Sequence, residues 1–123
     1  MTASSKTAER LRLAAAAAAV VVLVAVPSAG CAQSDAHALA VRVCGTVRSS
    51  LRLERRAEAA SPAAAAPLRH RAVLALQNVE PMAAIAAGED PTWQALQATL
   101  SEVGAVPLRL LAQALGAQCS GVS

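Results

Sequence analysis

The sequence predicts an all-α protein, a small bundle of three to four helices that follows an N-terminal signal helix. Alanine, leucine, arginine and glutamine, which are strong helix formers, make up much of the chain. Alternation of β-branched and polar residues, the pattern of a half-buried strand, is nearly absent. Apolar residues instead recur at helical spacing, as in Ala40, Cys44, Val47 and Leu51.

The first 30 residues have the layout of an export signal. Met1–Arg12 is basic, with one lysine and two arginines against a single acid. Leu13–Val26 is apolar and uncharged, but it is shorter than the roughly 20 residues that a membrane-spanning helix needs. It fits the apolar core of a secretory signal peptide. Pro27 should break that helix and leave residues 28–30 extended for a signal peptidase.

The motif Ser28-Ala29-Gly30-Cys31 resembles the bacterial lipobox, in which cleavage before a cysteine exposes it for lipid attachment. Ala29, Gly30 and Cys31 match, whereas Ser28 stands where an aliphatic residue is usual. The resemblance implies cleavage between Gly30 and Cys31, lipidation of Cys31 and a short tether over residues 31–34. Plain secretion after ordinary cleavage, and an uncleaved or cytoplasmic protein, stay open as alternatives.

The cysteine count agrees with lipidation. If Cys31 is acylated, Cys44 and Cys119 are left, and an exported protein can pair them. Such a disulfide would join the first and last helices and contribute about 4 kcal/mol. Two free buried thiols are the alternative. No C-x-x-C spacing points to redox activity.

Composition limits the partners of the exported part. Residues 31–123 contain eight arginines, no lysine and seven acids, a net charge of +1, and Trp93 is the only aromatic residue. Nucleic-acid binding is therefore not expected, because it needs a clustered basic face and usually stacking aromatics. Alanine buries little area, so we expect one small domain with a thin core.

The expected helical domain covers residues 35–119, and a tail follows at 120–123. Its first helix should run from a cap at Ser34 or Asp35 to about residue 59. Gly45 either weakens that helix or permits another helix to approach closely. The low-complexity stretch 60–67 is predicted to be a linker.

Prolines and glycines divide the rest of the domain. A second helix should begin at Pro67, and Pro81 should end or kink it before a short segment 82–87. Asp90 as N-cap and Pro91 at the first helical position predict a third helix, which Gly104 should stop. Trp93, Leu96 and Leu100 share a face of this helix. The last helix, from Pro107, should align Leu108, Leu111, Leu115 and Cys119.

No residue pattern indicates catalysis or a bound cofactor, and we expect no enzyme activity. His37 and His70 lack metal-ligand spacing and should be exposed. Glu54 and Glu58 are expected on a solvated helix face, and Glu89 and Asp90 to serve as caps. A basic stripe is formed by Arg48, Arg52, Arg55 and Arg56. It is predicted to be an ordinary solvated face, with contact to anionic lipid headgroups as the alternative.

The layout as a whole resembles the small alanine-rich lipoproteins of high-GC actinobacteria, through Cys31, the use of arginine in place of lysine, and a cysteine near each end of the domain. This resemblance implies a lipid-anchored, non-catalytic helical protein on the extracytoplasmic face of the cytoplasmic membrane. Its partners would be the membrane and an envelope protein. A weaker likeness to mycobacterial haemophore-like proteins, through Cys44 and Cys119 alone, implies the alternative, a secreted carrier of haem or a small apolar ligand.

Overall fold

The computed structural model describes residues 29–123, with side chains described from Asp35 onward. Four α-helices and one 3₁₀ turn make up this part of the chain. They are α2 (Ala29–Glu58), α3 (Pro62–Glu89), η2 (Pro91–Trp93), α4 (Gln94–Ser101) and α5 (Leu108–Gln118). The prediction of an all-α bundle is confirmed. The signal peptide expected over residues 1–30 lies outside the described residues, apart from Ala29 and Gly30.

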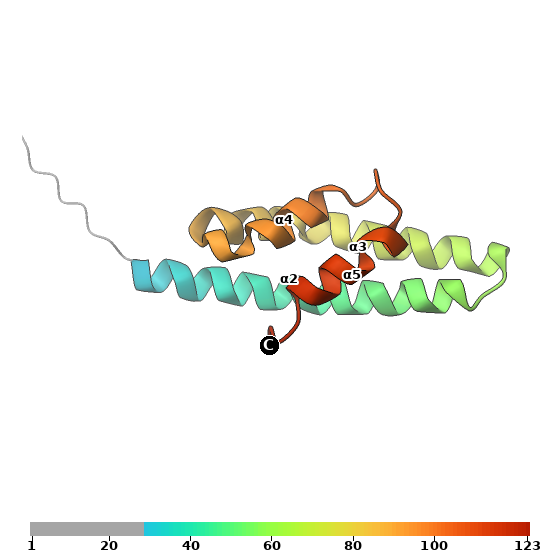
Figure 1. Cartoon of the computed structure of the whole chain (residues 1–123), viewed down its shortest axis with the longest axis horizontal. Coiled ribbons are helices and arrows are strands. Elements are labelled where there is room, and N and C mark those ends of the chain that lie inside the picture. The colour runs from blue at the N-terminus through green and yellow to red at the C-terminus, as the bar shows by residue number, and fades with distance from the viewer. Residues whose placement is uncertain (1–28) are drawn as a thin grey trace, which may run out of the picture.

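Two long antiparallel helices, α2 and α3, form a hairpin that carries the shorter ones (Figure 1). From Asp35 onward, seven of the nine buried side chains of α2 recur with alternating spacings of four and three residues, which is the seam of a coiled coil. They are Ala36, Ala40, Val43, Val47, Ser50, Glu54 and Ala57, and Cys44 and Leu51 are the other two. On α3 the buried residues are mostly alanines, and their small side chains allow the two helices to pack closely.

The shorter helices cover one side of the hairpin. α4 packs on α3, and α5 packs on both α2 and α4. Leu96 and Leu100 of α4 and Leu108 and Leu115 of α5 complete a core whose largest member on α3 is Leu76. The predicted stripe Ala40, Cys44, Val47 and Leu51 is buried in this core, as expected.

The N-terminal boundary of α2 differs from the prediction. Ala29 and Gly30, expected to be extended, are helical, and the expected tether at residues 31–34 is part of the same helix. Neither Ser34 nor Asp35 is therefore a cap. Alanine and glutamine between Gly30 and Asp35 favour continued helix, and no proline interrupts them. The chain thus enters the domain through a continuous helix.

The predicted linker at residues 60–67 is wrong for most of its length. α3 begins at Pro62, and Ser61 caps it by accepting a hydrogen bond from the Ala64 amide at 3.4 Å. Pro67 and Pro81 both lie inside α3, which neither proline ends. Each proline removes one helical hydrogen bond. Both rings are exposed, so the buried alanines and Leu76 pack against α2 undisturbed and offset that loss.

The later boundaries follow the sequence signals. Asp90 caps η2 by accepting a hydrogen bond from the Thr92 amide at 3.0 Å, and α4 continues directly from this turn. α4 ends at Ser101, and Gly104 adopts a φ of 99°, which glycine tolerates best. Pro107 precedes the first residue of α5. At Gly45 a Cβ atom would have no heavy atom within 4 Å, so no helix approaches closely there.

Candidate functional site

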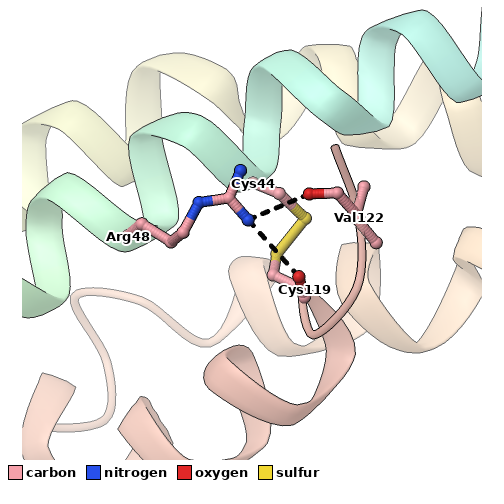
Figure 2. Close-up of a disulfide and its surroundings, with 4 residues drawn as sticks. All are labelled: Cys44, Arg48, Cys119 and Val122. Carbon is pink, nitrogen blue, oxygen red and sulfur yellow. Dashed lines mark hydrogen bonds between the residues drawn. A yellow bond between two sulfur atoms is a disulfide. The ribbon is translucent and has the colours of Figure 1, made fainter.

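A disulfide joins Cys44 of α2 to Cys119 at the end of α5, with an S–S distance of 2.08 Å (Figure 2). Both cysteines are buried in the core. The bond closes a sequence separation of 75 residues and holds the last helix of the domain against the first one. The predicted pairing is therefore confirmed, and the alternative of free thiols is wrong.

Arg48, one turn beyond Cys44, binds the end of the chain. Its Nη1 atom donates to the carbonyl oxygen of Val122 at 3.0 Å and to that of Cys119 at 3.4 Å (Figure 2). The guanidinium thus binds the carbonyl of Cys119, the C-cap residue of α5, and the carbonyl of Val122 in the tail beyond it. Of the predicted basic stripe, Arg48 therefore has a structural role, while Arg52, Arg55 and Arg56 are exposed on the outward face of α2.

Glu54 is buried, contrary to the prediction of a solvated position. Its Oε1 atom accepts a hydrogen bond from Nε of Arg69 on α3 at 3.2 Å. The side chain of Glu54 is 4% exposed and that of Arg69 47% exposed. Glu54 occupies a seam position of α2, between Ser50 and Ala57, and this register places its carboxylate between the helices. Glu58, one turn later, is exposed as predicted.

This ion pair lies at a cleft of about 330 Å³ between the hairpin and the start of α5. Val73, Pro107 and Leu108 supply its apolar walls, and Arg109 its second guanidinium. No side chain caps the first turn of α5, whose helix dipole places partial positive charge there. With Arg69 and Arg109 against Glu54, the cleft has a net positive charge and suits an anionic group that carries an apolar neighbour.

The two histidines lie far apart. Glu54 follows His37 by 17 residues along α2, a rise of about 25 Å, and His70 directly follows Arg69, the partner of Glu54. Both are exposed, as predicted. In residues 29–123 no three histidine, cysteine, aspartate or glutamate side chains gather in a way that could hold a metal ion. The haem-carrier alternative therefore has no converging pair of histidine ligands.

Trp93 packs at the other end of the hairpin. It is half-buried against the core, and its ring centroid lies 6.1 Å from that of His37, at an interplanar angle of 45°. Its face is shared with the buried Leu96 and Leu100, as predicted. Trp93 therefore anchors η2 and the start of α4, and it stands on the opposite end of the hairpin from the Arg69 cleft.

The predicted lipidation site lies at the edge of the described region. Cys31 falls in the first turns of α2, where only the backbone is described. Cleavage between Gly30 and Cys31 stays a prediction. Among the described residues, no helix is long and apolar enough to cross a membrane.

Sequence reasoning missed the cleft at Arg69 and Arg109. The available signal was the four-three spacing that continues from Val47 through Ser50 and Glu54 to Ala57, since it assigns Glu54 to the buried seam. A buried carboxylate requires a cationic partner, which pointed to an arginine of the facing helix. Comparison of the chain with known protein families, with curated proteins and with solved structures gave no match.

Proposed function

We propose that this chain is an exported protein, anchored by lipid at Cys31 to the outer face of the bacterial cytoplasmic membrane. It acts without catalysis, by binding another component of the cell envelope. Residues 1–30 direct export and are then removed. The helical domain is the working part, and α2 connects it directly to the anchor.

The disulfide between Cys44 and Cys119 is the observation that carries this proposal. Structural disulfides form and persist in oxidising compartments outside the bacterial cytoplasm. The bond also uses two of the three cysteines in the sequence. Cys31, at the end of the lipobox-like motif, is the one left for a lipid.

The described surface supports a binding role. Leu74 and Ile85 on α3 and Leu110 on α5 are large apolar side chains that are 44%, 54% and 62% exposed. The cleft between Arg69 and Arg109 adds a charged recess with apolar walls. These surface features fit contact with a partner. The interior, in contrast, is filled by packed leucines and valines such as Leu76, Leu96 and Val43.

Cell fractionation tests the proposal. The wild-type chain, expressed in a bacterium with its own signal, should be recovered in the membrane fraction and released by detergent but not by high salt. The Cys31→Ser chain should leave that fraction. A Cys44→Ser and Cys119→Ser chain keeps Cys31 and serves as the control for a general effect of losing cysteines. Membrane recovery of the Cys31→Ser chain equal to wild type would contradict lipid anchoring.

A further inference from the structure

Charged side chains are segregated along the long axis of the molecule. The hairpin end, defined as residues 52–71 together with Arg109, contains six arginines and two glutamates, a net charge of +4. The arginines are Arg52, Arg55, Arg56, Arg69, Arg71 and Arg109. The other described side chains, from residue 35 onward, contain two arginines and five acids, a net charge of −3. The two halves sum to +1, so the composition alone conceals the separation.

Folding creates this basic end. Arg52, Arg55 and Arg56 lie at positions i, i+3 and i+4 of α2, so they share one outward face. The turn between α2 and α3 brings the first part of α3 back beside that stretch (Figure 1). This part of α3 contains Arg69 and Arg71, and α5 adds Arg109 at the cleft. Of the two glutamates, Glu54 is buried and already paired with Arg69.

Most guanidinium groups at the hairpin end have no acidic partner. Across residues 35–123, the pair of Arg69 with Glu54 is the one ion pair that lies within 4.0 Å. Arg52 donates only to the neighbouring Ser49 hydroxyl, at 3.0 Å. Arg55, Arg56, Arg71 and Arg109 are exposed. Unpaired arginines crowded at one end repel each other, and an anionic partner would relieve that repulsion.

We propose that the hairpin end binds an anionic polymer of the cell envelope, a chain of repeating phosphodiester or carboxylate groups. The proposal rests on the proposed export of the chain and specifies the partner. The basic groups are spread over α2, α3 and α5, so a small anion touches only two or three of them, whereas a flexible polymer can contact all of them. The cleft between Arg69 and Arg109 receives one anionic unit of the polymer.

Three observations favour such a polymer over lipid headgroups or nucleic acid. Asp35 and Glu89 line one shallow pocket near the anchored end of α2 together with Arg42, and Asp90 follows Glu89. Three acids against one arginine give this end a net negative charge, so an anionic leaflet repels it. Arg52 lies 21 residues beyond Cys31, about 32 Å along α2, which carries the basic end outward. Trp93, the one aromatic residue, stands at the far end and cannot stack on a bound base.

Binding measurements on the purified chain test the proposal. The exported chain, residues 31–123 with Cys31→Ser, has neither a lipid nor the basic and apolar signal segment, and it is the reference protein. Its probes are polyphosphate, polygalacturonate, vesicles of phosphatidylglycerol with phosphatidylcholine, and duplex DNA, each measured over a range of salt concentrations. The test variant adds Arg52→Gln, Arg55→Gln and Arg56→Gln, because glutamine preserves helix propensity. Arg42→Gln, an exposed arginine in the other half of the molecule, is the matched control.

The reference protein should bind at least one of the two polymers more tightly than vesicles or DNA, with an affinity that falls as salt rises. The triple variant should bind at least tenfold more weakly and with a smaller salt dependence, while Arg42→Gln stays within twofold of the reference. Should the triple variant unfold, Arg71→Gln with Arg109→Gln replaces it, with the same expectation. Absence of polymer binding at low salt, equal losses for variant and control, or tighter binding to vesicles or DNA would overturn the proposal. Since the reference protein has no lipid attached at residue 31, each result is independent of the fractionation experiment.

Discussion

Glu54 and Arg69 form an ion pair across the hairpin, with 3.2 Å between Oε1 and Nε. The two partners are unequal, since the carboxylate is buried and the guanidinium is half-exposed. The Oε2 atom of Glu54 has no hydrogen-bond partner among the described residues, so Arg69 supplies the compensation for its buried charge. The pair therefore fixes the register of α2 against α3, because a shift of one helix along the other would leave the buried carboxylate of Glu54 without its partner.

Loss of Arg69 should destabilise the domain more than loss of Glu54. Arg69→Ala leaves a buried carboxylate without its partner and should lower the free energy of unfolding by about 2 kcal/mol. Glu54→Gln removes the charge itself and should have a smaller effect. Urea unfolding followed by circular dichroism measures both. Arg71→Ala, an exposed neighbour on α3, is the control and should stay within about 0.5 kcal/mol of wild type. Equal effects for Arg69→Ala and Arg71→Ala would contradict a stabilising pair.

The disulfide should supply a large share of the stability. Replacing both partners, Cys44→Ala and Cys119→Ala, releases a loop of 75 residues and should lower the free energy of unfolding by about 4 kcal/mol. Domains of this size have only about 5–15 kcal/mol in total. Thermal and urea unfolding of the oxidised and the substituted chains measure the difference. Cys31→Ser is the matched control and should leave the unfolding midpoint unchanged. A double alanine chain as stable as wild type would refute the role assigned to the bond.

Gly104 and Gly88 should respond oppositely to alanine. Gly104 has a φ of 99°, and a Cβ there would lie 2.6 Å from Nε2 of Gln77. Gly104→Ala should therefore destabilise the domain by about 1–2 kcal/mol. Gly88 lies in the last turn of α3, where a Cβ meets nothing within 4 Å. Gly88→Ala should stabilise it by about 0.5 kcal/mol. Differential scanning calorimetry gives both, and the same sign for the two substitutions would contradict the backbone assignment.

The cap at Asp90 should lose its effect in acid. The hydrogen bond from the Thr92 amide, aided by the Thr92 hydroxyl, lowers the pKa of Asp90 below its ordinary value of 3.8. Because the pKa of Asp90 is lower in the folded state, the ionised carboxylate stabilises the folded state fully at pH values above the unfolded-state pKa. That stabilisation disappears as the pH falls through the lowered folded-state value. Thermal unfolding of wild type and Asp90→Asn, measured from neutral pH down to about pH 2, detects it.

The asparagine side chain of that variant still accepts a cap hydrogen bond, but it does not titrate. Near neutral pH, the difference in melting temperature between wild type and Asp90→Asn should not change with pH. Below about pH 4 wild type should lose stability relative to the variant. Parallel curves over the whole range would show that the carboxylate contributes nothing to the cap.

Local signals and packing explain which features the sequence predicted. Asp90-Pro91, Gly104 and Pro107 act within one turn of the chain, and a helix begins or ends within three residues of each. Ser61-Pro62 is the same cap-and-proline signature as Asp90-Pro91. The alanine run after it suggested a linker, because alanines with two prolines have little to bury alone. In the fold, Ala65 and Ala72 are buried by packing against α2. This burial stabilises the segment as a helix, and it depends on a contact that is distant in sequence.

The candidate site was harder to predict, for a different reason. Arg69 and Arg109 are 40 residues apart in sequence, and no local pattern connects them. The net charge of residues 31–123 is only +1, because the acids of the other half offset the arginines of the hairpin end, and this small value concealed the basic surface. A turn near residue 60 folds two arginine-containing stretches onto one end, and such a charge separation depends on topology more than on composition.

Intact mass analysis of the chain recovered from bacterial membranes is the decisive test of whether this exported domain is anchored by lipid. We expect a chain that begins at Cys31 and is heavier than its peptide mass by a diacylglycerol group, with or without a further acyl chain. Treatment with reductant should add two hydrogen atoms, one for each of Cys44 and Cys119. A chain that retains residues 1–30, or one that begins at or before Cys31 without added lipid, would contradict it.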